Sequence, residues 1–149
     1  MSKFSITSKD FKEGEEIPKK FGYKFENEQP NIRFGYLPDG TETFALIMDD
    51  PDAMAAVGKV WVHWLYFTTG ELNQLEGIYH ENTIHGKTDF GEIGYGGPAP
   101  PNGRHTYIFK GYALDEKLDL KEGYSKQELE NAMKGHIIAE ARLTGTFTP

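Results

Sequence analysis

The stretch VWVHWLYF at residues 60–67 holds one histidine in an otherwise apolar run, which predicts a strand buried on both faces. Successive side chains of a strand point to opposite faces of a sheet. Strict alternation puts four of these side chains on one face: Trp61, His63, Leu65 and Phe67. An unpaired buried polar group is costly, so this histidine must have partners. Taken alone, His63 is most simply a core histidine satisfied by a backbone carbonyl.

Two further segments bring polar groups to apolar strands. In RHTYIF, residues 104–109, alternation puts His105 and Tyr107 on one face. The apolar run ALIM at residues 45–48 leads into DDPD, where the proline must end the strand. Asp50 and Asp52 can cap that turn through local backbone amides. We predict that Asp52 braces the turn, and that Asp50 meets both histidines and the tyrosine in one pocket.

The composition predicts one acidic globular domain spanning residues 1–149. Hydrophobic residues make up 38% of the chain and the net charge is −7, which fits a packed core and disfavours nucleic acid and anionic membranes as partners. No apolar run approaches the roughly 20 residues of a membrane span, and the first ten residues have no hydrophobic signal core. We therefore expect a cytoplasmic protein. The lack of cysteine excludes disulfides, thiolate metal sites and thiol catalysis.

Apolar patterning and turn residues predict a sheet-rich chain. The expected strands lie within residues 3–11, 31–36, 41–48, 60–68, 105–114 and 143–147. Residues 31–36 and 41–48 read as a hairpin around Pro38-Asp39-Gly40, with the second arm central in a sheet that is covered on both sides. Residues 70–85 read as loops and short pieces, with His80 and His85 solvated. Residues 86–103 are too rich in glycine and proline for regular structure and predict an ordered functional loop.

One helix is clearly signalled. Ser125 and Glu128 form a capping box, and Tyr124 can pack onto Leu129 as a hydrophobic staple. An apolar stripe then continues at helical spacing through Leu129, Ala132, Met133, His136, Ile137 and Ala141. His136 on this helix is a packing or C-terminal residue rather than a ligand.

Three blocks of this sequence together resemble the phosphatidylethanolamine-binding protein (PEBP) family, also called the Raf kinase inhibitor-like family, in its short prokaryotic form. The blocks are FALIMDDPDA at 44–53, WVHW at 61–64, and DFGEIGYGGP at 89–98 running into PPNGRHTY at 100–107. Each block alone is weak, but their order and spacing make the resemblance specific. The segments GHIIA at 135–139 and LTGTF at 143–147 also look like the family's prokaryotic C-terminal end, so the likeness spans nearly the whole chain.

The resemblance implies a mainly β protein, a PEBP-like antiparallel β-sandwich with a helix near the C-terminus, short helical pieces, and a small anion pocket at the end of the central sheet. Members of this family bind phosphate-like or carboxylate groups and phospholipid headgroups there. Carried over by position, the ligand-binding residues are Asp50, Trp61, His63, Gly97, Pro98, His105 and Tyr107, with Asp52 and Met54 in support. The family's usual proline is Met54 here, which predicts a softer wall of the pocket.

Other functions are weighed against this one. Two histidines and a carboxylate suit zinc or iron, yet no local chelating pair such as H-x-x-x-H is present, so we expect no metal and no cofactor. A hydrolase would need a water-activating Asp-His pair, because neither a nucleophile elbow nor a cysteine exists. We expect a non-enzymatic protein that binds phosphate, carboxylate or phosphoethanolamine-like ligands. The alternative is an interaction protein that inhibits a kinase or a protease, and a homodimer is compatible with either function.

Overall fold

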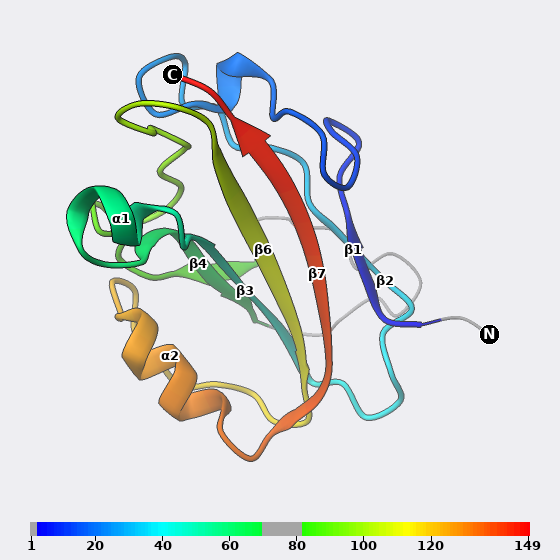
Figure 1. Cartoon of the computed structure of the whole chain (residues 1–149). Helices are drawn as coiled ribbons and strands as arrows, with labels where there is room; N and C mark the ends of the chain where they lie inside the picture. Colours follow the sequence, from blue (N-terminus) through cyan, green and yellow to red (C-terminus); the bar gives the residue numbers. More distant parts are fainter. Residues whose placement is uncertain (1–2, 70–81) are drawn as a thin grey trace.

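The computed structural model describes residues 3–69 and 82–149 and contains two antiparallel sheets (Figure 1). The larger sheet has the strand order β5-β4-β3-β6-β7, and the smaller pairs β1 with β2. The strands are β1 (Ser5–Thr7), β2 (Arg33–Gly35), β3 (Thr43–Asp50), β4 (Trp61–Thr68), β5 (Thr83–His85), β6 (His105–Leu114) and β7 (Ile137–Phe147). The helical elements are η1 (Lys19–Phe21), α1 (Ala53–Val57) and α2 (Lys126–Met133). The predicted mainly β, antiparallel fold is confirmed.

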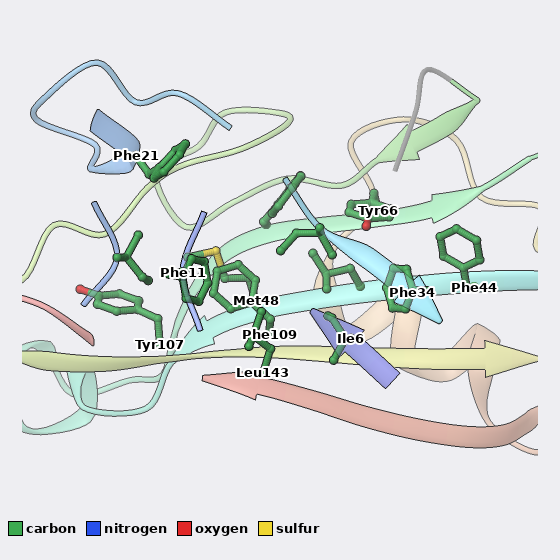
Figure 2. Packing of buried hydrophobic residues seen from close by; sticks show 14 of the residues in the cluster. Ile6, Phe11, Phe21, Phe34, Phe44, Met48, Tyr66, Tyr107, Phe109 and Leu143 are labelled. Atoms are coloured by element: carbon green, nitrogen blue, oxygen red, sulfur yellow. The ribbon is translucent and has the colours of Figure 1, made fainter. Parts of the chain in front are cut away.

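The large sheet is covered on both faces. Figure 2 shows the main core on one face, where Ile6 of β1 and Phe34 of β2 pack with Phe44 and Phe109 of the large sheet. On the other face, α2 contributes Leu129 to a second apolar cluster. All eight residues of β3 are buried. The predicted central, doubly covered strand is therefore confirmed.

A β-bulge at His63 breaks the predicted alternation of β4. Met48 pairs with Trp64 and Asp49 pairs with Val62, so His63 is the extra residue of β4. Beyond the bulge the faces are exchanged: Trp64 lies in the main core with Tyr107, and Leu65 and Phe67 lie in the cluster beside α2. The prediction that His63 shares a face with Leu65 and Phe67 is wrong, because an inserted residue reverses the side-chain parity. His63 keeps its predicted neighbour Trp61.

The predicted hairpin between residues 31–36 and 41–48 is also wrong. β2 pairs with β1, with Phe34 opposite Ile6, while both edges of β3 are occupied by β4 and β6. The turn itself exists, since Thr41 N–H donates to the Pro38 carbonyl, but the chain crosses from one sheet to the other there. Alternation within each arm identifies strands, whereas their partners depend on tertiary packing.

Helix α2 begins as predicted and ends earlier. The capping box at Ser125 is confirmed, with both reciprocal hydrogen bonds present. The helix stops at Met133 because Gly135 turns the chain at φ +84°. Strand β7 begins at Ile137, so it includes the last part of the predicted helical stripe, up to Ala141, as well as the strand predicted at 143–147. His136 lies in this turn, where its ring contacts the carboxylates of Asp115 and Glu116.

The region predicted as loops and short pieces contains β5. His85 is a residue of this strand and is half-buried, so the expectation that it is solvated is wrong. Burial lowers the pKa of His85. His80 lies outside the described residues.

Removing the cap of α2 tests the local energetics of the fold. Ser125→Ala deletes the acceptor for the Glu128 N–H and should lower the free energy of unfolding by about 1 kcal/mol. Urea denaturation measures this. Glu128→Gln is the matched control, because a glutamine keeps the reciprocal bond to Ser125 N–H, and a change as large as that of Ser125→Ala would contradict the assigned role of the serine.

Candidate functional site

A cavity of about 160 Å³ lies where the end of β3, the starts of β4 and β6, and α1 meet the loop that follows β5. Its polar lining comes from the three strands, and its apolar lining comes mainly from α1 and the loop. The lining residues are Asp50, Ala53, Ala56, Val57, Trp61, His63, Phe90, Ala99, Pro101 and His105. The structure thus brings together four of the residues that the sequence predicted: Asp50, Trp61, His63 and His105.

Asp50 and His105 form a buried, hydrogen-bonded pair in the wall of this cavity. His105 Nδ1 lies 2.6 Å from Asp50 Oδ2, and the other carboxylate oxygen accepts the Asp52 N–H at 2.9 Å. An ionised carboxylate can only accept, so the Nδ1 of His105 carries the proton and donates it. In the neutral ring Nε2 is then an acceptor, and it becomes a donor only in the imidazolium form.

His63 is held in the same tautomer by the backbone. Its Nδ1 lies 2.7 Å from the Gly96 carbonyl, which can only accept, so Nδ1 is protonated. The Gly96 N–H in turn donates to the His63 carbonyl at 2.8 Å. Burial lowers the pKa of His63 below its ordinary value, while the Gly96 hydrogen bond and the charge of Asp50 oppose that shift. The neutral ring therefore has Nε2 as an acceptor, as in His105.

The loop that closes the cavity is ordered by hydrogen bonds to β4. Asp89 N–H donates to the Val62 carbonyl, and the Asp89 carboxylate accepts the Val62 N–H at 2.7 Å and the Lys59 ammonium at 2.8 Å. The next residue, Phe90, sets its ring edge-on against both Trp61 and His63, with ring centroids 5.6 and 5.5 Å apart. The glycine- and proline-rich segment is an ordered loop because its carboxylate and its aromatic ring fasten it to the strand.

Tyr107 packs against His63 without lining the cavity. Its ring lies edge-on to His63 with centroids 5.1 Å apart, and it is fully buried. Burial, together with the nearby charge of Asp50, raises the pKa of Tyr107. A hydrogen bond to Asp50 also contributes to the raised pKa of Tyr107. The indole N–H of Trp61 is a buried donor that lacks an acceptor among the described residues.

Four other predicted residues do not line the cavity. Gly97 and Pro98 are buried against the N-terminal segment, where the Pro98 carbonyl accepts the Tyr23 N–H at 2.9 Å. Asp52 accepts the Thr106 N–H at 2.8 Å and so ties the turn after β3 to β6, whereas the local amide of the turn, Asp52 N–H, donates to Asp50. Met54 is 53% exposed and is not among the residues that line the cavity, so the predicted softer wall is wrong.

The apolar walls were missed at the sequence level. Ala53, Ala56 and Val57 belong to α1, a five-residue helix, and Ala99 and Pro101 belong to the loop. The signal was present in AMAAV at 53–57, a run of helix-favouring residues directly after the turn at Pro51. It is too short to stand out from the surrounding loops.

A second, more open hollow of about 500 Å³ lies beside the start of α2. Lysines 59, 87 and 126 line it together with Asp89, Glu128 and Glu130. Two of the lysines are already paired, Lys59 with Asp89 and Lys126 with the buried Asp49. Because its charges are mixed and largely neutralised, this hollow is a weaker candidate than the histidine cavity.

The described part of the chain contains neither a metal-binding cluster nor a membrane-spanning helix. No group of three or more histidine or acidic side chains is arranged there to hold a metal ion. Within residues 3–69 and 82–149, no helix is both long and apolar enough to cross a bilayer.

Known proteins are similar to this chain in sequence and in fold. A family model described as phosphatidylethanolamine-binding protein matches residues 7–148. A UPF0098 protein of Methanothermobacter thermautotrophicus is 41% identical over 138 residues, which cover 88% of this chain and 89% of that one. A UPF0098 protein of Chlamydia muridarum is 38% identical over 146 residues, covering 95% and 97%.

Two crystal structures are similar over almost their full length. A PEBP homolog of Chlamydia trachomatis has a TM-score of 0.88 at 35% identity and covers 100% of this chain and 99% of its own. Escherichia coli YbcL, described as a member of the mammalian PEBP family, has a TM-score of 0.86 at 26% identity and covers 99% of each chain. The fold and these matches define a prokaryotic ligand-binding β protein of the PEBP type. The chain belongs to the phosphatidylethanolamine-binding protein family.

Proposed function

We propose that the protein binds a small anion in the cavity between His63 and His105: a phosphate or carboxylate group, either free or as part of a phospholipid headgroup. The observation that carries the proposal is that each ring uses Nδ1 to bond the protein while lining one small cavity, so that its Nε2 is the nitrogen left for a ligand. The indole N–H of Trp61, which has no acceptor among the residues that the structure describes, adds a buried donor at the same cavity.

In this proposal, protonation of a histidine ring strengthens the binding of the anion. The neutral rings offer acceptors through Nε2, which suits a protonated phosphate or an amine, and the carboxylate of Asp50 disfavours a fully ionised ligand. Protonation of either ring turns its Nε2 into a charged donor, and charge-assisted hydrogen bonds to an anion are roughly twice as strong as neutral ones. Among the described residues no lysine or arginine lines the cavity, so the histidines supply the positive charge.

The remaining functional alternatives stay predictions. The part of the chain that the structure describes places no serine or threonine in the cavity lining beside the Asp50–His105 pair, so a hydrolase would have to use water as the nucleophile. A regulated kinase or protease, a homodimer and a cytoplasmic location are equally predictions of the sequence.

Anion affinity should rise as the pH falls from 8 to 5. Because burial holds the pKa of His63 below the ordinary value of about 6.5, proton uptake on binding should continue below that pH, with a gain of up to about tenfold in affinity per pH unit and proton. Calorimetric titration with phosphate and phosphoethanolamine measures this. Sulfate, whose charge is constant over this range, separates titration of the protein from titration of the ligand.

Two variants make this test specific. His63→Ala should abolish the binding. His136→Ala should leave it unchanged, because His136 is paired with the exposed carboxylates of Asp115 and Glu116 and does not line the cavity. Sulfate and phosphate affinities that are independent of pH, or that survive in His63→Ala, would refute the proposed function.

A further inference from the structure

One asparagine of the N-terminal segment holds the loop that touches His63. Asn27 Oδ1 accepts the Gly97 N–H at 2.8 Å, and its Nδ2 lies 3.5 Å from the Tyr95 carbonyl. Since an N–H must donate, the atom facing Gly97 is the amide oxygen. Asn27 lines no part of the cavity and is 70 residues from Gly97 in sequence.

The bond from Asn27 ends on the same peptide unit that holds His63. The carbonyl of Gly96 and the N–H of Gly97 belong to one planar, trans peptide, so they point in opposite directions. Its N–H faces Asn27 and its carbonyl faces His63 Nδ1 at 2.7 Å. This rigid unit therefore links the asparagine to the imidazole.

A peptide between two glycines has little intrinsic resistance to reversal, because neither residue has a Cβ to restrict it. If this peptide were reversed, its N–H would face His63 Nδ1. Nδ1 would then have to accept, and the proton would move to Nε2. The orientation of one peptide thus decides which ring nitrogen of His63 is presented as a donor.

We infer that Asn27 is a positioning residue that sets the tautomer of His63 by holding the Gly96–Gly97 peptide in one orientation. Asn27 itself adopts a left-handed backbone at φ +51°, a conformation that asparagine tolerates better than other residues with a Cβ. The inference builds on the proposed function, since the tautomer matters for ligand binding only if the cavity binds a ligand.

The test compares three variants by nitrogen NMR of histidine-labelled protein, which reports the protonated ring nitrogen without any ligand. Asn27→Gly removes the acceptor while tolerating the positive φ, and a population with the proton on Nε2 should appear. Asn27→Asp keeps an oxygen acceptor, and the proton should stay on Nδ1. Asn31→Gly is the matched control, because Asn31 accepts Lys9 N–H away from the cavity and its loss should change nothing.

Phosphate binding supplies the second readout. In Asn27→Gly, the neutral ring of His63 already donates from Nε2 at pH 8, so protonation at lower pH adds less to binding. The ratio of the phosphate affinities at pH 5 and pH 8 should therefore be about tenfold smaller than in the wild type, which is the effect of one hydrogen bond. A merely structural role would change stability and leave both readouts as they are.

Each outcome decides the inference. His63 fully protonated on Nδ1 in folded Asn27→Gly, or Asn27→Asp behaving like Asn27→Gly, would overturn it. If Asn27→Gly does not fold, the wild-type protein and Asn27→Asp still test the inference. A His63 ring protonated on Nε2 in place of Nδ1 in either protein would contradict the observed hydrogen bonds. If the tautomers change as expected but the wild-type protein binds no phosphate, the positioning role holds and the proposed function fails.

Discussion

Asp50→Asn is expected to tighten phosphate binding at pH 8 by about tenfold or more and to flatten its dependence on pH. In the wild-type protein, Asp50 accepts hydrogen bonds from Asp52 N–H and from His105 Nδ1. An asparagine can accept only with its oxygen, which the backbone N–H of the turn should retain. Its NH₂ group then faces His105 Nδ1, which must accept, and the proton moves to Nε2 as a neutral donor for the ligand. The repelling negative charge is lost at the same time.

The surface pair of Asp115 and His136 provides a matched control. These residues make the same kind of contact, at 2.9 Å, but half-exposed and outside the cavity, so Asp115→Asn should not alter phosphate binding. Calorimetry at pH 6 and pH 8 measures the affinities, and nitrogen NMR measures the tautomer of His105. Weaker binding by Asp50→Asn at both pH values would contradict the role given to the carboxylate.

Among the glycines that the structure describes, Gly97 is the one where replacement by alanine should be most damaging. A Cβ on Gly97 would lie 1.9 Å from the backbone carbonyl oxygen of Phe21, an atom that cannot move without displacing η1 and the segment after it. We expect a loss of about 3 kcal/mol or more in the free energy of unfolding, at the upper end of overpacking effects. The loop should also lose its contact with Asn27, so that phosphate binding falls even where the variant stays folded.

Gly103→Ala is the control for this substitution. Gly103 belongs to the same glycine-rich loop and has open space around its Cα, and its φ of +66° costs an alanine roughly 1–2 kcal/mol. Urea denaturation of both variants compares a steric clash with a backbone penalty. A Gly97→Ala protein that is as stable as Gly103→Ala would show that the close approach of the loop to Phe21 is not needed.

The sequence could predict those features that depend on local chemistry. The capping box of α2 needs only two residues three positions apart, and burial of β3 is visible in its uninterrupted apolar run. The faces of β6 follow from regular alternation, and the structure indeed places His105, Tyr107 and Phe109 toward the same side of the sheet.

The remaining features depend on distant partners. Nothing in residues 60–67 reveals the bulge at His63, because the register against β3 determines it. The pairing of β2 with β1 depends on β6 occupying the second edge of β3. Asn27 was not singled out at all, since an asparagine in an irregular segment has no pattern, and its contact lies 70 residues away.

The contacts that build the cavity join segments far apart along the chain. Asp50 and His105 are 55 residues apart, and His63 bonds the Gly96 carbonyl across 33 residues. Entropy lost in closing such long loops must be offset before any of these contacts stabilises the chain, which makes non-local β topologies slow to fold. We therefore expect the imidazoles and the carboxylate to meet late in folding, so that a partly folded chain contains the residues of the site without its recognition chemistry.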